Sequence, residues 1–83
     1  MTPEEIAKLT GLAWFRALDS VRQDVILSVA MNTDRLNEPI LIALEQRDWI
    51  AAAYELCNAF SWNHQVGWER CKELGDALEH GKW

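Results

Sequence analysis

Carboxylates, thiols and imidazoles are the groups of this 83-residue chain that could do acid–base, nucleophilic or metal chemistry. A glycosidase needs two carboxyl groups flanking one bond, one of them with its pKa raised by an apolar pocket. Many of the acidic residues instead fall at expected helix starts, where free amides favour negative charge. These are Glu4, Glu5, Asp19, Glu38 and Asp48. We therefore expect no catalytic residue.

The cysteines and histidines give a second candidate site. Cys57, His64 and Cys71 are spaced seven residues apart, and His80 follows. Zinc ligands usually include a closely spaced pair such as Cys-x-x-Cys. The observed spacing favours two reduced core thiols and a loop histidine, with no metal and no cofactor. A single bridge between the two cysteines is the alternative that the sequence leaves open.

A polar and aromatic cluster precedes the last expected helix. It consists of Trp62, Asn63, His64 and Gln65, and Asn32 is a further polar candidate at the end of an earlier helix. Aromatic faces and amide side chains suit carbohydrate binding. A tryptophan buried as a loop anchor and polar residues that cap helices explain the same pattern, and we favour that explanation.

An acidic row is expected along the last helix. Glu69, Glu73, Asp76 and Glu79 recur at helical spacing, so their side chains share one face. Such a row could face a basic surface of another macromolecule, although a solvated face accounts for it more simply. With Trp68 and the aromatic cluster, it forms the predicted binding surface, because exposed aromatic and charged residues often anchor interfaces.

The elements that must position these residues are all helices. The patterns predict helices from about Thr2 to Thr10, from about Ser20 to Asn32, from Asn37, from Asp48 to Phe60, and over residues 68–80. Residues 12–18 are either a further short helix or a continuation past Gly11. The predicted fold is a compact all-α bundle of five to six short helices. Its centre is the helix over about residues 20–32, which is apolar on nearly every face.

Composition limits the class of protein. Hydrophobic residues are 49% of the chain and five of them are tryptophans, so one domain over residues 1–83 can bury a core. The net charge of −5 and the scattered Lys and Arg disfavour direct nucleic-acid binding. There is no apolar stretch long enough to span a membrane. The acidic start is unlike a signal peptide, so we expect the cytoplasm of the host cell.

Three stretches carry a resemblance to a known family. They are residues 18–23 (LDSVRQ), residues 43–53 (ALEQRDWIAAA), and residues 61–65 (SWNHQ) continuing to the closing Gly81-Lys82-Trp83. From Leu18 onward the chain resembles the C-terminal helical lobe of tailed-phage lysozymes. The resemblance implies a lobe-like part over residues 19–83, with residues 1–18 as a helical cover over the surface that the missing lobe would occupy.

The resemblance also bears on activity. The family's catalytic glutamate lies in the other lobe, ahead of a hairpin with a Thr-x-Gly-x-Gly-His run. The glycines of this chain cannot form that run; they are Gly11, Gly67, Gly75 and Gly81. We expect a non-enzymatic phage or prophage protein that binds a protein or ribonucleoprotein with a basic surface, inhibiting or modulating a host component such as a defence system. The alternative is a peptidoglycan-binding module, or an inactive remnant or split half of a lysozyme.

Overall fold

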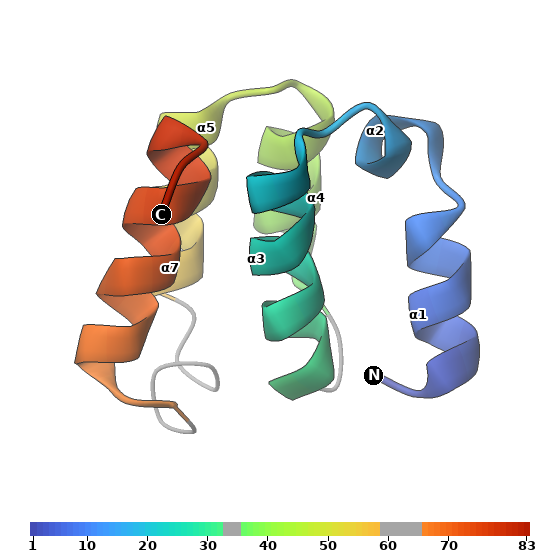
Figure 1. The fold of residues 1–83 in the computed structure, drawn as a ribbon, viewed down its shortest axis with the longest axis horizontal. Coiled ribbons are helices and arrows are strands. Elements are labelled where there is room, and N and C mark those ends of the chain that lie inside the picture. The colour runs from blue at the N-terminus through green and yellow to red at the C-terminus, as the bar shows by residue number, and fades with distance from the viewer. Residues whose placement is uncertain (33–35, 59–65) are drawn as a thin grey trace.

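The computed structural model describes residues 1–32, 36–58 and 66–83, and these residues form helices and no strand (Figure 1). The predicted all-α class is therefore confirmed. The helices are α1 (Pro3–Thr10), α2 (Ala13–Arg16), α3 (Ser20–Asn32), α4 (Glu38–Glu45), α5 (Trp49–Asn58) and α7 (Trp68–His80).

The N-terminal segment forms two helices. Thr2 and Glu5 make a capping box at the predicted helix start: the Thr2 hydroxyl accepts from the Glu5 amide at 3.2 Å, and the Glu5 carboxylate accepts from the Thr2 amide at 3.1 Å. Helix α1 ends at Gly11, and α2 begins after Leu12 in extended conformation. The segment after Gly11 is thus a separate short helix.

Residues 1–18 contribute to the core of the domain. Leu9, Phe15 and Leu18 are buried, and the indole of Trp14 packs edge-to-face on Phe15 at 6.1 Å between ring centroids. Helix α1 lies on the side of α3 opposite to α7 (Figure 1). The N-terminal helices therefore cover one side of α3.

Helix α3 begins at Ser20, and the carboxylate of Asp19, the residue before it, accepts from the Arg22 amide at 3.1 Å. Val25, Ile26, Val29 and Ala30 are buried on one side of α3. This helix was expected to be buried on nearly every side. That expectation is wrong for Met31, which is 71% exposed. With about 3.6 residues per turn, Met31 lies on the side of α3 opposite to these four buried residues, so its side chain faces away from the core.

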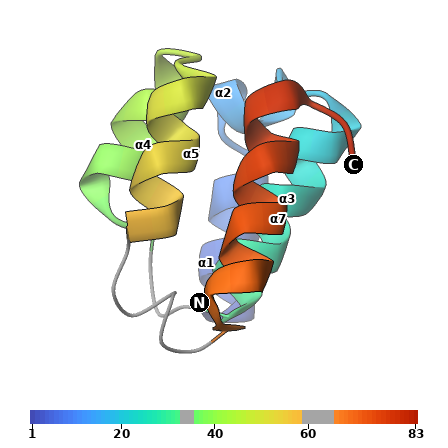
Figure 2. The ribbon, with the colours of Figure 1, turned by 90° about the vertical axis from the view of Figure 1, so that its left-hand side faces the viewer.

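Helices α4, α5 and α7 complete the bundle. Asn37 caps α4 by accepting from the Ile40 amide at 3.0 Å, and Asp48 caps α5 by accepting from the Ala51 amide at 3.1 Å, both as predicted. Helix α5 was expected to reach Phe60, which lies outside the described residues. Helices α5 and α7 run side by side in opposite directions (Figure 2).

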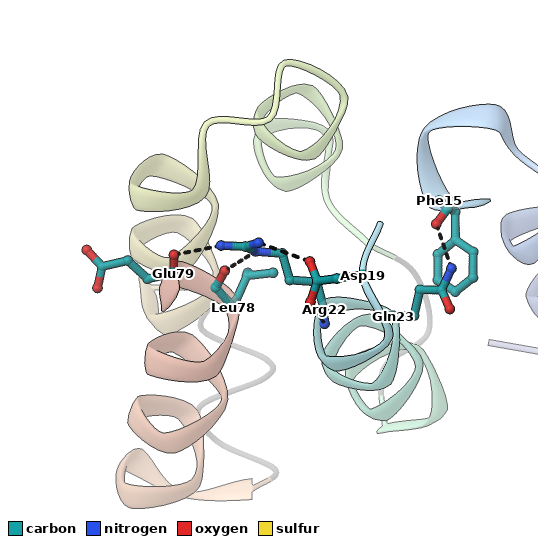
Figure 3. Close-up of polar contacts among 6 residues, drawn as sticks. All are labelled: Phe15, Asp19, Arg22, Gln23, Leu78 and Glu79. Atoms are coloured by element: carbon teal, nitrogen blue, oxygen red, sulfur yellow. Dashed lines mark hydrogen bonds and ion pairs between the residues drawn. The ribbon is translucent and has the colours of Figure 1, made fainter. Parts of the chain in front are cut away.

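One side chain ties α3 to the end of α7. The guanidinium of Arg22 donates from Nε to the Leu78 carbonyl at 2.7 Å and from Nη2 to the Glu79 carbonyl at 2.8 Å (Figure 3). Nη1 pairs with the Asp19 carboxylate at 3.0 Å. The last carbonyl groups of a helix lack hydrogen-bond partners within that helix, and Arg22 donates to two of them. The positive charge of its guanidinium also lies at the negative end of the α7 dipole, which is favourable.

Candidate functional site

The acidic row lies on the outer side of α7. Glu69, Glu73 and Asp76 are exposed, and the side chain of Glu79 retains 33% of its accessible surface. The buried side of α7 carries Cys71, Leu74, Gly75, Ala77 and Leu78. The four carboxylates thus share the side of the helix that faces away from the core.

Arg70 reduces the charge of this row, and His80 does so only when its imidazole is protonated. Arg70 pairs with Glu73 at 2.6 Å between Nη1 and Oε1, and His80 Nε2 lies 3.4 Å from Glu79 Oε2. Lys72 is also exposed on the same helix. Within the described chain, Glu69 and Asp76 are left without an ion pair, so they are the carboxylates most available to a basic partner.

Trp68 was expected to be part of the binding surface, and its side chain is 61% exposed. Trp68 is the first residue of α7, and Cys71 follows it by nearly one turn. Cys71 contacts Cys57, which lies close to the last described turn of α5.

The binding surface predicted from the sequence did not include two exposed residues of α5. Ile50 is 70% exposed and Tyr54 is 65% exposed. They are four residues apart, so they lie one above the other on the side of α5 opposite to buried Ala52 and Leu56. Their spacing could have revealed them, because a helix whose core stripe includes residues 52 and 56 must turn residues 50 and 54 outward.

A shallow groove joins the two helices at one end. Its volume is about 440 Å³, and it is lined by Arg47, Asp48, Trp49, Ile50, Glu79 and His80. It lies between the start of α5 and the end of α7. We call the exposed surface of these two adjacent helices the α5–α7 face. It comprises Ile50, Tyr54, Trp68, Glu69, Glu73, Asp76 and Glu79.

A second groove lies between the N-terminal cover and α4. It has a volume of about 390 Å³ and apolar walls, and it is lined by Met1, Glu5, Lys8, Leu9, Leu12, Leu36 and Leu41. The Glu5 carboxylate accepts from the Thr2 amide in the capping box, and hydrogen bonding with Thr2 lowers the pKa of Glu5. An apolar groove therefore stays open between the N-terminal helices and α4.

The remaining predicted site residues divide into two groups. Trp62, Asn63, His64 and Gln65 lie outside the described residues. Asn32 is described, and its side-chain amide donates to the Ser28 carbonyl at 2.8 Å. That contact is the local backbone bond expected of a residue that ends a helix.

Within residues 1–32, 36–58 and 66–83, His, Cys, Asp and Glu side chains do not gather in a group of three that could hold a metal ion. The same residues contain no helix with the length and apolar character needed to cross a membrane. Comparison with family models, with curated proteins and with solved structures finds no match to this chain.

Proposed function

We propose that this chain is a non-catalytic protein of phage or prophage origin that binds a basic surface of a host protein or ribonucleoprotein. Binding through the α5–α7 face would inhibit or modulate that host component. The observation that carries the proposal is that Ile50 and Tyr54 of α5 and Trp68 of α7 are exposed on two helices that pack together, and that Ile50 lines one groove with Glu79 of the acidic row. Large hydrophobic side chains rimmed by charge are typical of protein interfaces.

The charge of the face argues for a basic partner over a second copy of the chain. In a two-fold symmetric dimer the same patch meets itself. Carboxylates of α7 would then approach carboxylates of the other copy, and like charges brought together cost binding energy. A surface rich in Lys and Arg gains attraction from the same groups and accelerates association at low salt.

The carboxylates that line the two grooves support a non-catalytic role. Glu5 belongs to the capping box, Asp48 caps α5, and Glu79 lies beside His80. A general acid of a glycosidase needs a raised pKa, whereas the pKa of Glu5 is lowered. The resemblance to a lysozyme lobe without its catalytic partner supports the same proposal, as well as the phage origin.

The test is a capture experiment with matched variants. The wild-type chain, a face variant (Ile50→Ser with Tyr54→Ser) and a charge variant (Glu69→Lys with Asp76→Lys) are immobilised and exposed to host lysate. Met31→Ser and Glu38→Lys serve as controls, since both residues are exposed on helices other than α5 and α7. We expect the wild type and both controls to retain a common partner that the face and charge variants lose.

The captured partner is then purified and titrated calorimetrically against each variant. We expect affinity to fall at least about tenfold in the face variant, because truncating an interface anchor costs more than 1 kcal/mol. Raising the salt should weaken wild-type binding. A partner that binds all variants equally well would show that the α5–α7 face is not the binding surface.

The peptidoglycan-binding alternative has a separate readout. Chitooligosaccharides are added to the labelled chain while backbone amide shifts are recorded. Our proposal predicts no saturable change. Saturable shifts centred on Asn32 and residues 62–65 would favour the sugar-binding module instead, and cell-wall turnover by the purified chain would contradict the non-catalytic assignment.

A further inference from the structure

The two cysteines of the chain lie on the seam between α5 and α7. Cys57 is near the last described turn of α5, and Cys71 is in the first turns of α7. These helices are adjacent and antiparallel (Figure 2). The Cys57 thiol donates to the Cys71 backbone carbonyl, with 3.4 Å between Sγ and the oxygen. The Cys57 sulfur therefore lies directly against the Cys71 residue.

Small residues let the two helices approach closely at this point. A Cβ placed on Gly75, one turn beyond Cys71, would be 2.8 Å from the Cys57 sulfur and 3.7 Å from the Ala53 carbonyl. Only a residue without a side chain leaves room for that sulfur. A disulfide requires Cα atoms about 4.4–6.8 Å apart, and the close packing of α5 and α7 at Ala53 and Gly75 holds the Cys57 sulfur 3.4 Å from the Cys71 carbonyl oxygen.

The two thiols differ in their access to solvent. Cys71 is completely buried, whereas Cys57 is half-buried. Burial raises the pKa of the Cys57 thiol, and nearby Asp76 raises it further. Burial likewise raises the pKa of Cys71, and Cys57 adds to the increase. A reagent in solution would therefore meet Cys57 first, and its reaction should be faster above neutral pH, where more thiolate forms.

We propose that Cys57 and Cys71 form an intramolecular disulfide when the chain meets a low-molecular-weight disulfide such as oxidised glutathione. The Cys57 thiolate attacks one glutathione sulfur, forms a mixed disulfide and releases the first glutathione thiolate. The Cys71 thiol then loses its proton, attacks the Cys57 sulfur and releases the second glutathione. The protein loses two hydrogen atoms, and one oxidised glutathione becomes two reduced molecules.

The bond would link α5 to α7 across the connection between them. The two cysteines are 14 residues apart, so the cross-link closes a short ring that includes residues 59–65 and Trp68. Closing a ring of this size restricts the unfolded chain more than the folded one, where the helices already lie together. The oxidised form should therefore be the more stable one, and a reductant should reverse the change.

The test uses the purified full chain in buffers with different ratios of oxidised to reduced glutathione. Samples are quenched in acid, alkylated and weighed as intact protein. We expect a monomer that is 2 mass units lighter than the reduced chain and carries no alkyl group. Trypsin cuts after Arg47, Arg70 and Lys72, so the cross-link should appear as residues 71–72 joined to residues 48–70.

The contribution of the folded structure to disulfide formation is measured by repeating the glutathione titration in concentrated urea. We expect the equilibrium constant for disulfide formation to be at least about tenfold larger in native buffer. The melting temperature of the oxidised chain should rise by about 10 °C and return after reduction. Cys57→Ser, at a half-buried position, serves as the control and should show no shift under oxidant.

Three results would overturn the proposal. The first is a glutathione adduct on Cys57 that never resolves to the internal bond. The second is a cross-linked product of twice the chain mass. The third is an equilibrium constant no larger in native buffer than in urea, since the folded structure would then contribute nothing to the pairing.

Discussion

The guanidinium carbon of Arg22 lies 4.2 Å from the centroid of the Trp49 ring. The same group hydrogen-bonds the end of α7 and Asp19. A single side chain therefore joins α3, the start of α5 and the end of α7. The Arg22 side chain is only 15% exposed. Its removal would therefore leave the Leu78 and Glu79 carbonyl groups without this partner in a largely dry environment.

Replacing Arg22 should destabilise the domain more than replacing any exposed arginine. We expect Arg22→Ala to lower the free energy of unfolding by about 3 kcal/mol, because two charge-assisted hydrogen bonds and the stacking on Trp49 are lost. Arg22→Lys should cost about half as much, since an ammonium lacks the planar fork. Urea unfolding followed by circular dichroism measures both.

Arg16→Ala is the matched control for that experiment. Arg16 is exposed on α2, so its replacement should change stability by less than about 0.5 kcal/mol. Equal costs at residues 16 and 22 would contradict the role given to the Arg22 contacts.

Gly81 and Arg22 should be energetically coupled. Gly81 ends α7 with φ of 71°, and a Cβ there would lie 2.8 Å from Arg22 Nη1. We expect Gly81→Ala to cost about 2 kcal/mol from the left-handed backbone and the displaced guanidinium. In an Arg22→Ala background the cost should fall, because only the backbone strain remains.

Gly67 provides the control for this double-mutant cycle. It also has a positive φ, 85°, but no atom lies within 4 Å of an added Cβ. Gly67→Ala should therefore destabilise the chain through backbone strain alone, by the same amount with or without Arg22. Coupling of Gly67 to Arg22 as strong as that of Gly81 would rule out the proposed clash.

Asp19 should make the stability depend on acidic pH. Partial burial acts to raise its pKa, but hydrogen bonds from the Arg22 amide and guanidinium outweigh it and leave the pKa below 3.8. A lowered folded-state pKa stabilises the fold above the unfolded value, and that stabilisation is lost as pH falls through the folded value. We expect Asp19→Asn to show a shallower loss of stability between about pH 5 and pH 2.

Carbon-detected titration of the Asp19 carboxyl gives an independent measurement. Its pKa should lie below the ordinary value in the wild type and rise in Arg22→Ala. Glu5, whose pKa is also lowered by the capping box, should be unaffected by that substitution. An unchanged Asp19 pKa would mean that Arg22 is not its electrostatic partner.

The effect of Gly75→Ala on the free energy of unfolding should change sign when Cys57 is replaced by alanine. In the wild type the added Cβ would meet the Cys57 sulfur at 2.8 Å, so we expect a loss of about 1–3 kcal/mol. In a Cys57→Ala background the next atoms lie at 3.7 Å or beyond. The substitution should then be neutral or stabilising, because alanine favours helix over glycine by about 1 kcal/mol.

Gly11→Ala is a useful comparison for this pair. Its φ is −85° and the nearest atoms to an added Cβ are 3.5 Å away, so we expect little change in either background. Thermal unfolding of the single and double variants measures the coupling. A destabilising Gly75→Ala in both backgrounds would place the steric conflict elsewhere.

The sequence alone determined the local structure. Thr2, Asn37 and Asp48 cap their helices as predicted, and Gly81 ends α7, because capping depends on residues only a few positions apart. The acidic row on α7 could be located for the same reason, since residues three and four apart share a face of one helix.

Tertiary packing decided which of these surfaces is covered. Trp68 is exposed although Cys71, in the same turn of α7, is completely buried, and no local pattern of the sequence contains that information. Arg22 reaches Leu78 and Glu79 across 56 and 57 residues of sequence. The Cys57–Cys71 seam likewise exists only because α5 and α7 pack over Gly75. Contacts between helices depend on how whole elements dock, so the binding face and the thiol pair required the folded structure.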